Sequence, residues 1–156
     1  DLKDAVLMGF SMGGWAAASV AVMTTERISK LILVDAVGIK PGGREDRDIA
    51  DIFALRPEKL VELMWHDSNN APNPSDLSDE QAQLLIANRT ALAMYTWDPY
   101  MHDPRLKHRL HRIDVPTLLI WGESDGLVTT DYAKAYRDLI PAAELFHSLN
   151  YYFELG

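Results

Sequence analysis

Short apolar runs alternate with helix-like segments along this chain. Four of the runs predict β-strands: Ala5–Phe10, Lys30–Asp35, Thr117–Trp121 and Glu144–Leu149. Between them, Trp15–Met23 is rich in small apolar residues, and Tyr132, Tyr136 and Leu139 mark one face of another helix. This rhythm predicts an α/β fold with right-handed crossovers and a mostly parallel sheet of about four strands, covered on both faces.

The alternation is interrupted once, between the second and third strands. Residues 39–113 open with the loop KPGGRED and continue with helical patterns. Pro57 suits the first turn of a helix through LVELMW, and Ser78 to Gln81 read as a capping box before a helix through MYTW. The segment is too long for a loop, so we expect a small helical domain inserted into a core of residues 1–38 and 114–156.

The uncharged stretch from Ala5 to Thr25 is about as long as a membrane span. Gly9, Ser11 and the Gly13–Gly14 pair lie in its middle, and its two halves differ in character. A buried strand, a sharp turn and a helix explain the stretch better than a span does. We therefore expect no membrane partner.

Charge and composition exclude several kinds of partner and of active site. The 156 residues carry a net charge of −8, whereas nucleic acids and anionic lipids attract basic surfaces. There is no cysteine, which excludes disulfides, thiolate metal sites and a cysteine nucleophile. We expect no nucleic-acid partner, no cofactor and no metal. The opening residues DLKD are not a signal peptide, and we expect a cytoplasmic protein whose oligomeric state the sequence does not indicate.

The stretch GFSMGG, residues 9–14, joins the first strand to the following helix. A serine on such a tight turn has its hydroxyl lifted above the sheet edge, which suits a nucleophile. Gly9 and Gly13 are expected where side chains would strike the neighbouring strand and helix. The Met12 N–H would point toward an oxyanion at the positive end of the helix. The alternative is a glycine-rich turn in which Ser11 only caps the helix.

A second candidate follows the third strand, in TLLIWGESDGLV, residues 117–128. Asp125 comes just after that strand, and the carboxyl ends of parallel strands share one edge of a sheet, so it is expected on the same edge as Ser11. Its carboxylate would orient a histidine and stabilise the positive charge of that histidine. The alternative is an aspartate that only caps a turn.

Together these residues resemble the α/β-hydrolase fold family, in the branch that bears a cap domain. The resemblance rests on GFSMGGWAAA (9–18), ISKLILVDAVG (28–38), VPTLLIWGESDGLV (115–128) and the following helix up to IPAAEL (140–145). It implies strands five to eight of that fold, with residues 39–113 as the cap, Ser11 as nucleophile and Asp125 as acid. Asp35 holds a position that supplies the acid in some members.

A serine nucleophile implies an acyl-enzyme, and hence an ester, a thioester, a lactone or the ketone of a carbon–carbon bond hydrolase as substrate. The cap would form most of the pocket and exclude water. Its aromatic and Met side chains suit a small apolar ester-like substrate, although for any one of them the cap's own core is the simpler expectation. The candidate pocket residues are Phe10, Trp65, Trp97, Leu127 and Val128.

The histidine of such a site is not in its expected place. In the family it follows the last strand, where this chain has NYYFELG with Phe153 at the corresponding spacing. His147 is near but inside the predicted strand, and it is the remaining candidate for the base. The other histidines fall in the insertion or its return: His66, His102, His108 and His111.

In the family the second oxyanion donor comes from a loop after strand three, before the point where this chain starts. We therefore expect the C-terminal part of a longer serine hydrolase, with little or no turnover by itself. A complete but degenerate protein, or a sheet completed by another chain, are the alternatives. Two other functions stay open: a non-catalytic small-molecule binding or interaction module, and a cofactor-free haloperoxidase with the same Ser-His-Asp set.

Overall fold

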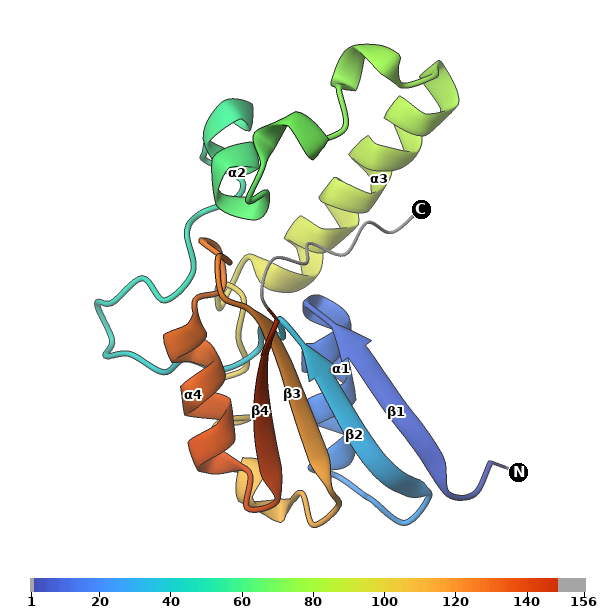
Figure 1. The fold of residues 1–156 in the computed structure, drawn as a ribbon, viewed down its shortest axis with the longest axis vertical. Helices are drawn as coiled ribbons and strands as arrows, with labels where there is room; N and C mark the ends of the chain where they lie inside the picture. Colours follow the sequence, from blue (N-terminus) through green and yellow to red (C-terminus); the bar gives the residue numbers. More distant parts are fainter. Residues whose placement is uncertain (1, 149–156) are drawn as a thin grey trace.

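The computed structural model describes residues 2–148 (Figure 1). Four parallel strands form one sheet in chain order: β1 (Ala5–Phe10), β2 (Ile28–Val34), β3 (Thr117–Gly122) and β4 (Ala143–Ser148). All four predicted strands are confirmed. The predicted end of the last strand at Leu149, and Phe153 beyond it, lie outside the described residues.

Helices connect the strands and make up much of the insertion. The α-helices are α1 (Met12–Ala21), α2 (Pro57–Met64), α3 (Asp79–Thr96) and α4 (Thr130–Leu139), with 3-10 turns η1 (Ser68–Asn70), η2 (Pro74–Asp76) and η3 (Leu110–Arg112). Helix α1 begins before the predicted Trp15 because the turn at Ser11 leads directly into it. The capping box is confirmed, since Ser78 and Gln81 exchange hydrogen bonds at 3.3 and 2.9 Å. No helix within residues 2–148 is long and apolar enough to cross a membrane.

One face of the sheet carries the core. Leu31, Leu33, Leu119 and Trp121 have no exposed surface, and they belong to one buried cluster with residues of α1 and α4. The arrangement has a topological reason. Strands that succeed one another in the same direction across a sheet, joined by right-handed crossovers, place their connections on one side.

The opposite face is more exposed than the sequence predicts. Val6, Met8, Phe10 and Phe146, at alternate positions of the two edge strands, are between 45% and 58% exposed. The prediction of a sheet covered on both faces is therefore wrong for residues 2–148. The sequential strand order puts both crossover helices on the core side, which leaves these apolar side chains uncovered within the described part.

Helices α2 and α3 of the insertion, residues 39–113, lie beyond the carboxyl ends of the strands, above the sheet in Figure 1, whereas its last part, with η3, packs against the core. Gly38 and His102 form a parallel bridge where the insertion leaves the core and returns. From α4, the Tyr136 hydroxyl donates to the Val37 carbonyl at 2.7 Å, and the Tyr132 hydroxyl donates to the Ile39 carbonyl. Helix α4 therefore holds the start of the insertion to the core.

Candidate active site

Ser11 lies in a strained turn between β1 and α1. Its backbone has φ 50° and ψ −117°, a left-handed conformation that is uncommon for a residue other than glycine. Its N–H donates to the Val34 carbonyl at 2.9 Å, and its carbonyl accepts from the Trp15 and Val37 N–H groups, each at 3.2 Å. Backbone bonds to the end of β2 and the start of α1 thus hold the strained conformation in place.

The Ser11 side chain makes no capping hydrogen bond to α1. Ser11 holds the N-cap position of α1, but its side chain supplies no capping bond there. The residue stands at the amino-terminal end of a helix, as the sequence predicts, and its role as nucleophile stays a prediction. The Met12 N–H is the first amide of that helix, and its service as an oxyanion donor stays a prediction.

At two of the glycines around Ser11 there is no room for a side chain. These are Gly9 and Gly14, whereas the sequence predicts Gly9 and Gly13. A Cβ on Gly9 would lie 2.2 Å from the Gly13 carbonyl oxygen, and a Cβ on Gly14 would lie 2.4 Å from the Ala36 Cβ. A Cβ on Gly13 would meet nothing within 4 Å. The expectation that Gly13 avoids a clash is wrong because Gly13 is exposed, whereas the buried Gly14 faces the segment after β2.

Asp125 lies in the turn after β3, on the same edge of the sheet as Ser11. Its Oδ1 accepts the N–H groups of Leu127 and Val128, both at 2.8 Å, so it does cap a turn. Among residues 2–148 its second carboxylate oxygen accepts no hydrogen bond, which leaves it open to a further donor. Burial raises the pKa of Asp125, and the two amides oppose that rise.

Ser11 and Asp125 follow strands that are separated by β2. Neighbouring strands lie about 4.8 Å apart, so the two strand ends are about 10 Å apart. An imidazole between a serine hydroxyl and a carboxylate hydrogen-bonds to both, and a gap of this order suits it. Among residues 2–148, no histidine hydrogen-bonds to Ser11 or Asp125.

Asp35 occupies the edge between them, directly after β2. Its Oδ1 accepts the Gly122 N–H at 3.0 Å, and its backbone has φ 42°. Burial raises its pKa to about 6; the Gly122 N–H lowers the value and the Asp125 carboxylate raises it further. The sequence indicated Asp35 only as a possible acid, because a position directly after a strand does not reveal its partners.

His147, the base candidate, lies in β4 with Trp121 of β3 as its register partner. Strand β4 is the edge of the sheet opposite to β1. The Nδ1 atom of His147 is buried, and among residues 2–148 it has no hydrogen-bond partner. The structure therefore does not bring His147 and Ser11 together. His102 bonds through Nδ1 to the Tyr100 carbonyl at 2.8 Å, and His66, His108 and His111 are exposed.

The five candidate pocket residues come from separate elements. Phe10 ends β1 and is 45% exposed, while Trp65 and Trp97 follow the last residues of α2 and α3. Leu127 is half-buried beside the core, and Val128 belongs to the core, where its carbonyl accepts the Trp121 indole N–H at 2.7 Å. Their role as substrate-pocket residues stays a prediction.

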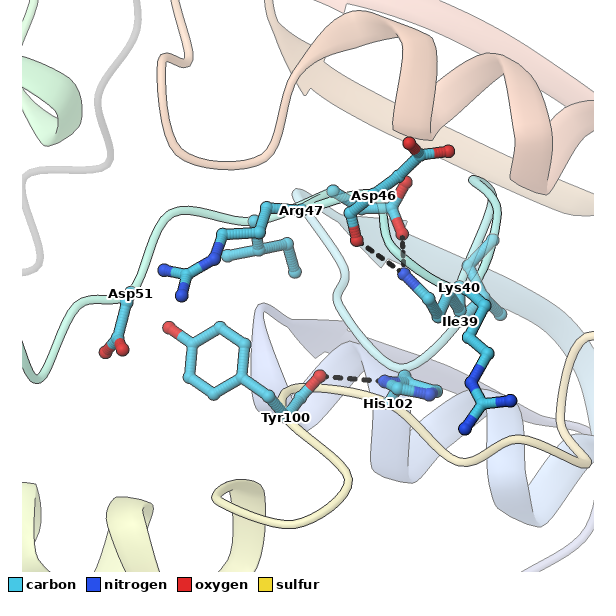
Figure 2. A pocket seen from close by; sticks show the side chains of 10 residues that line it. Ile39, Lys40, Asp46, Arg47, Asp51, Tyr100 and His102 are labelled. Atoms are coloured by element: carbon cyan, nitrogen blue, oxygen red, sulfur yellow. Dashed lines mark hydrogen bonds and ion pairs between the residues drawn. The ribbon is translucent and has the colours of Figure 1, made fainter.

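A cavity of about 280 Å³ lies at the base of the insertion, between the loop of residues 39–51 and the returning segment with Tyr100 and His102 (Figure 2). Six of the ten residues that line it have charged side chains. Lys40 pairs with Asp48 at 3.1 Å and donates to the Asp46 carbonyl at 2.7 Å. These contacts of Lys40 brace the loop. Residues 2–148 contain no group of three or more His, Asp or Glu side chains placed to hold a metal ion.

Comparison with known families agrees with this arrangement. A sequence profile of the alpha/beta hydrolase family matches residues 1–150, and the chain belongs to this family. It is 28% identical over 153 residues to a pimeloyl-(acyl-carrier protein) methyl ester esterase of Klebsiella pneumoniae, covering 90% of this chain and 59% of that protein. It is 26% identical to a 2-hydroxy-6-oxononadienedioate/2-hydroxy-6-oxononatrienedioate hydrolase of Paraburkholderia phymatum, covering 94% and 54%.

Solved structures show the same fold. A bacterial membrane phospholipase A matches with a TM-score of 0.70 at 22% identity, over 94% of this chain and 49% of that one. A meta-cleavage product hydrolase from Pseudomonas fluorescens matches with a TM-score of 0.63 at 20% identity, over 94% and 56%. The chain thus has a partial α/β-hydrolase fold and spans about half of these relatives.

Proposed function

We propose that this chain carries the nucleophile and the acid of a serine hydrolase that acts on a carboxylic ester or a related acyl or carbon–carbon bond. The observation that carries the proposal is the strained Ser11 turn, whose hydroxyl does not cap the helix that follows it. The named esterases and hydrolases among the relatives support the reaction class.

The residues have distinct tasks in this reaction. The Ser11 oxygen attacks the carbonyl carbon, a histidine takes the hydroxyl proton, and the carbonyl oxygen becomes an oxyanion that the Met12 N–H stabilises. The leaving alcohol accepts the proton from the histidine, and an acyl-enzyme remains on Ser11. Water then hydrolyses the acyl-enzyme by the reverse sequence of proton transfers, and Asp125 orients the histidine throughout.

The histidine that takes the proton from Ser11 is not yet assigned. His147 is the candidate within the chain, but its strand lies at the far edge of the sheet, where the residue is the register partner of Trp121. We therefore expect the 156 residues alone to have little or no turnover, with the base supplied from elsewhere in the protein or by a rearrangement of β4.

The insertion is proposed to act as a cap over the site. Helices α2 and α3 lie beyond the carboxyl ends of the strands, and Ser11 and Asp125 follow β1 and β3 at the same ends. Exposed apolar side chains on the insertion, such as Met94 at 81% and Trp97 at 59%, would favour a small apolar ester. The cytoplasmic location expected from the sequence stays a prediction.

The first experiment is covalent labelling with a fluorophosphonate, read by intact mass. We expect wild type to gain one phosphonate at most slowly, Ser11→Ala to gain none, and the matched control Ser19→Ala, on α1, to behave as wild type. Loss of labelling in His147→Ala would assign the base to His147. Labelling that persists in Ser11→Ala would contradict the proposal.

A non-catalytic binding module is the second candidate, because no histidine within residues 2–148 bonds to Ser11. Such a module would take up an apolar ester stoichiometrically, with equal affinity in wild type and Ser11→Ala. Calorimetric titration with a medium-chain methyl ester separates the two functions. Binding without labelling favours the module, whereas labelling at Ser11 favours the hydrolase.

A further inference from the structure

Asp35 lies between the two candidate catalytic residues without a role in the proposed reaction. It follows β2, the strand between β1 and β3. Its N–H donates to the Ile120 carbonyl of β3 at 3.1 Å. On its two sides, the Val34 carbonyl accepts the Ser11 N–H, and the Val37 N–H donates to the Ser11 carbonyl. The backbone around Asp35 is therefore bound directly to the strained serine turn.

The Asp35 carboxyl group extends this connection to the acid. Its Oδ1 accepts the Gly122 N–H at 3.0 Å, and the Gly122 carbonyl accepts the Asp125 N–H at 3.2 Å. A continuous series of bonded residues thus runs from Ser11 through Val34, Asp35 and Gly122 to Asp125. Within it, the Asp35 side chain is the link between the turn after β2 and the turn after β3.

The backbone conformation of Asp35 fits its place as a link between the two turns. Its φ of 42° is in the left-handed region, as is the φ of 50° at Ser11. Conformations of this kind are unfavourable for residues with a Cβ and persist where surrounding contacts enforce them. Here the left-handed backbone accompanies a carboxyl group that reaches the Gly122 amide across the strand ends.

The charge of Asp35 is sensitive to its surroundings. Burial raises its pKa to about 6, and the titratable side chain that acts on it is Asp125, from the turn after β3. Helix α1 has no titratable side chain. A carboxylate accepts an N–H more strongly than a neutral carboxylic acid does, so the bond to Gly122 strengthens as Asp35 ionises.

We propose that Asp35 is a positioning residue, whose carboxylate holds the Gly122 amide and thereby keeps the Asp125 turn at a set place relative to the Ser11 turn. The consequence for catalysis rests on the proposed serine hydrolase function. The link itself does not, because it is a property of the edge formed by β1, β2 and β3.

The link is tested by amide NMR of the whole chain over a titration from about pH 4 to about pH 8. We expect the Gly122 amide shift of wild type to titrate with a midpoint near 6. Asp35→Asn keeps an acceptor oxygen but cannot ionise, so this step disappears. The control Asp131→Asn, at an exposed site of α4, leaves the midpoint unchanged. A Gly122 amide that titrates in the same way without Asp35 overturns the proposal.

Positioning itself is tested by exchange and by labelling. We expect Asp35→Ala to speed hydrogen exchange of the Gly122 amide at least about tenfold, and Asp35→Asn to change it less than about threefold. Where Ser11 reacts with a fluorophosphonate, we expect the labelling rate to fall in Asp35→Ala and to change less in Asp35→Asn. In wild type the labelling rate rises with pH through the Asp35 midpoint. Equal exchange in wild type and Asp35→Ala would refute the link.

The two proposals fail separately. If wild type takes up no phosphonate at all, the serine hydrolase function is in question while the Gly122 titration and exchange still decide the role of Asp35. If Asp35→Ala does not fold, as judged by circular dichroism, the titration of wild type against Asp35→Asn is sufficient.

Discussion

At the scale of single residues, the serine turn is built by close backbone approach. Gly9 lies so near the first turn of α1 that any side chain would overlap the Gly13 carbonyl, while Gly14 packs on Ala36. The middle glycine of the three, Gly13, has open space around it. A pattern of glycines in the sequence therefore mixes positions under steric constraint with a position that is free to change.

This difference predicts opposite effects of two alanine substitutions. Gly9→Ala should lower the free energy of unfolding by about 2 kcal/mol or more, because backbone atoms must move to admit the Cβ. Gly13→Ala should leave it unchanged or raise it by up to about 1 kcal/mol, because alanine is the better helix former. Urea unfolding of the two variants beside wild type measures both. Equal destabilisation would contradict the difference in space between the two glycines.

Asp35 predicts a pH dependence of stability. Burial raises its pKa in the folded chain from 3.8 to about 6, so the folded state holds the proton more tightly than the unfolded state does. The stabilising effect of protonation is complete below about pH 4 and is lost as the pH rises through about 6. Asp35→Asn should flatten this decline and, at neutral pH, raise the free energy of unfolding by up to about 3 kcal/mol.

Urea unfolding at several pH values measures the decline in wild type and in Asp35→Asn, with Asp131→Asn as the exposed control. A wild-type stability that is constant between about pH 4 and about pH 7 would contradict the expectation. A more stable Asp35→Asn variant would also show that the ionised carboxylate is kept at a cost in stability, as is common at functional sites.

At the scale of elements, α4 connects the core to the insertion. Tyr132 and Tyr136 lie on its buried face, their rings pack with Trp121, and their hydroxyls reach the Val37–Ile39 segment. The helix periodicity placed both tyrosines on the core side. Their polar ends nevertheless find carbonyl groups at the start of the insertion, so one helix face provides both apolar packing and a polar anchor.

Removing one anchor has a definite expected cost. Tyr136→Phe keeps the ring but leaves the buried Val37 carbonyl without this donor, which should lower the free energy of unfolding by about 1–2 kcal/mol. Tyr95→Phe, at a residue of α3 that is 77% exposed, should change it by less than about 0.5 kcal/mol. Thermal unfolding of both variants compares them. If Tyr95→Phe lowers the free energy of unfolding as much as Tyr136→Phe does, the buried hydroxyl has no special role in stability.

At the scale of the whole molecule, the sheet has one packed face and one exposed apolar face within residues 2–148. Val6, Met8, Phe10 and Phe146 form the exposed apolar positions, and β1 is an edge strand without charge. Exposed apolar surface beside an unpaired strand edge favours association of protein chains.

A charge on this face should therefore keep the purified chain monomeric. Met8→Lys should reduce self-association at high concentration, while the free energy of unfolding changes by less than about 1 kcal/mol because the side chain is 54% exposed. Leu33→Lys, on the packed face, should prevent folding. Static light scattering and urea unfolding test the pair. A severe loss of stability in Met8→Lys would show that this face is covered in solution.

Local sequence patterns predicted much of the fold. The four strands, the helix through Tyr132 and Tyr136, and the capping box at Ser78 were predicted because apolar periodicity and capping chemistry act within a few residues. The resemblance to the family rests on the same segments, and the profile match over residues 1–150 confirms the family. The roles of Ser11 and Asp125 stay predictions.

The sequence by itself determined the elements and the turn that bears Ser11, because these depend on neighbours along the chain, and their alternation indicated parallel strands. Only the tertiary structure decided which face of the sheet is packed, which of the glycines are constrained, and that Asp35 bonds to Gly122. It also placed His147 in register with Trp121, at the edge opposite to Ser11. These features depend on contacts between residues far apart in the chain, which no local pattern encodes.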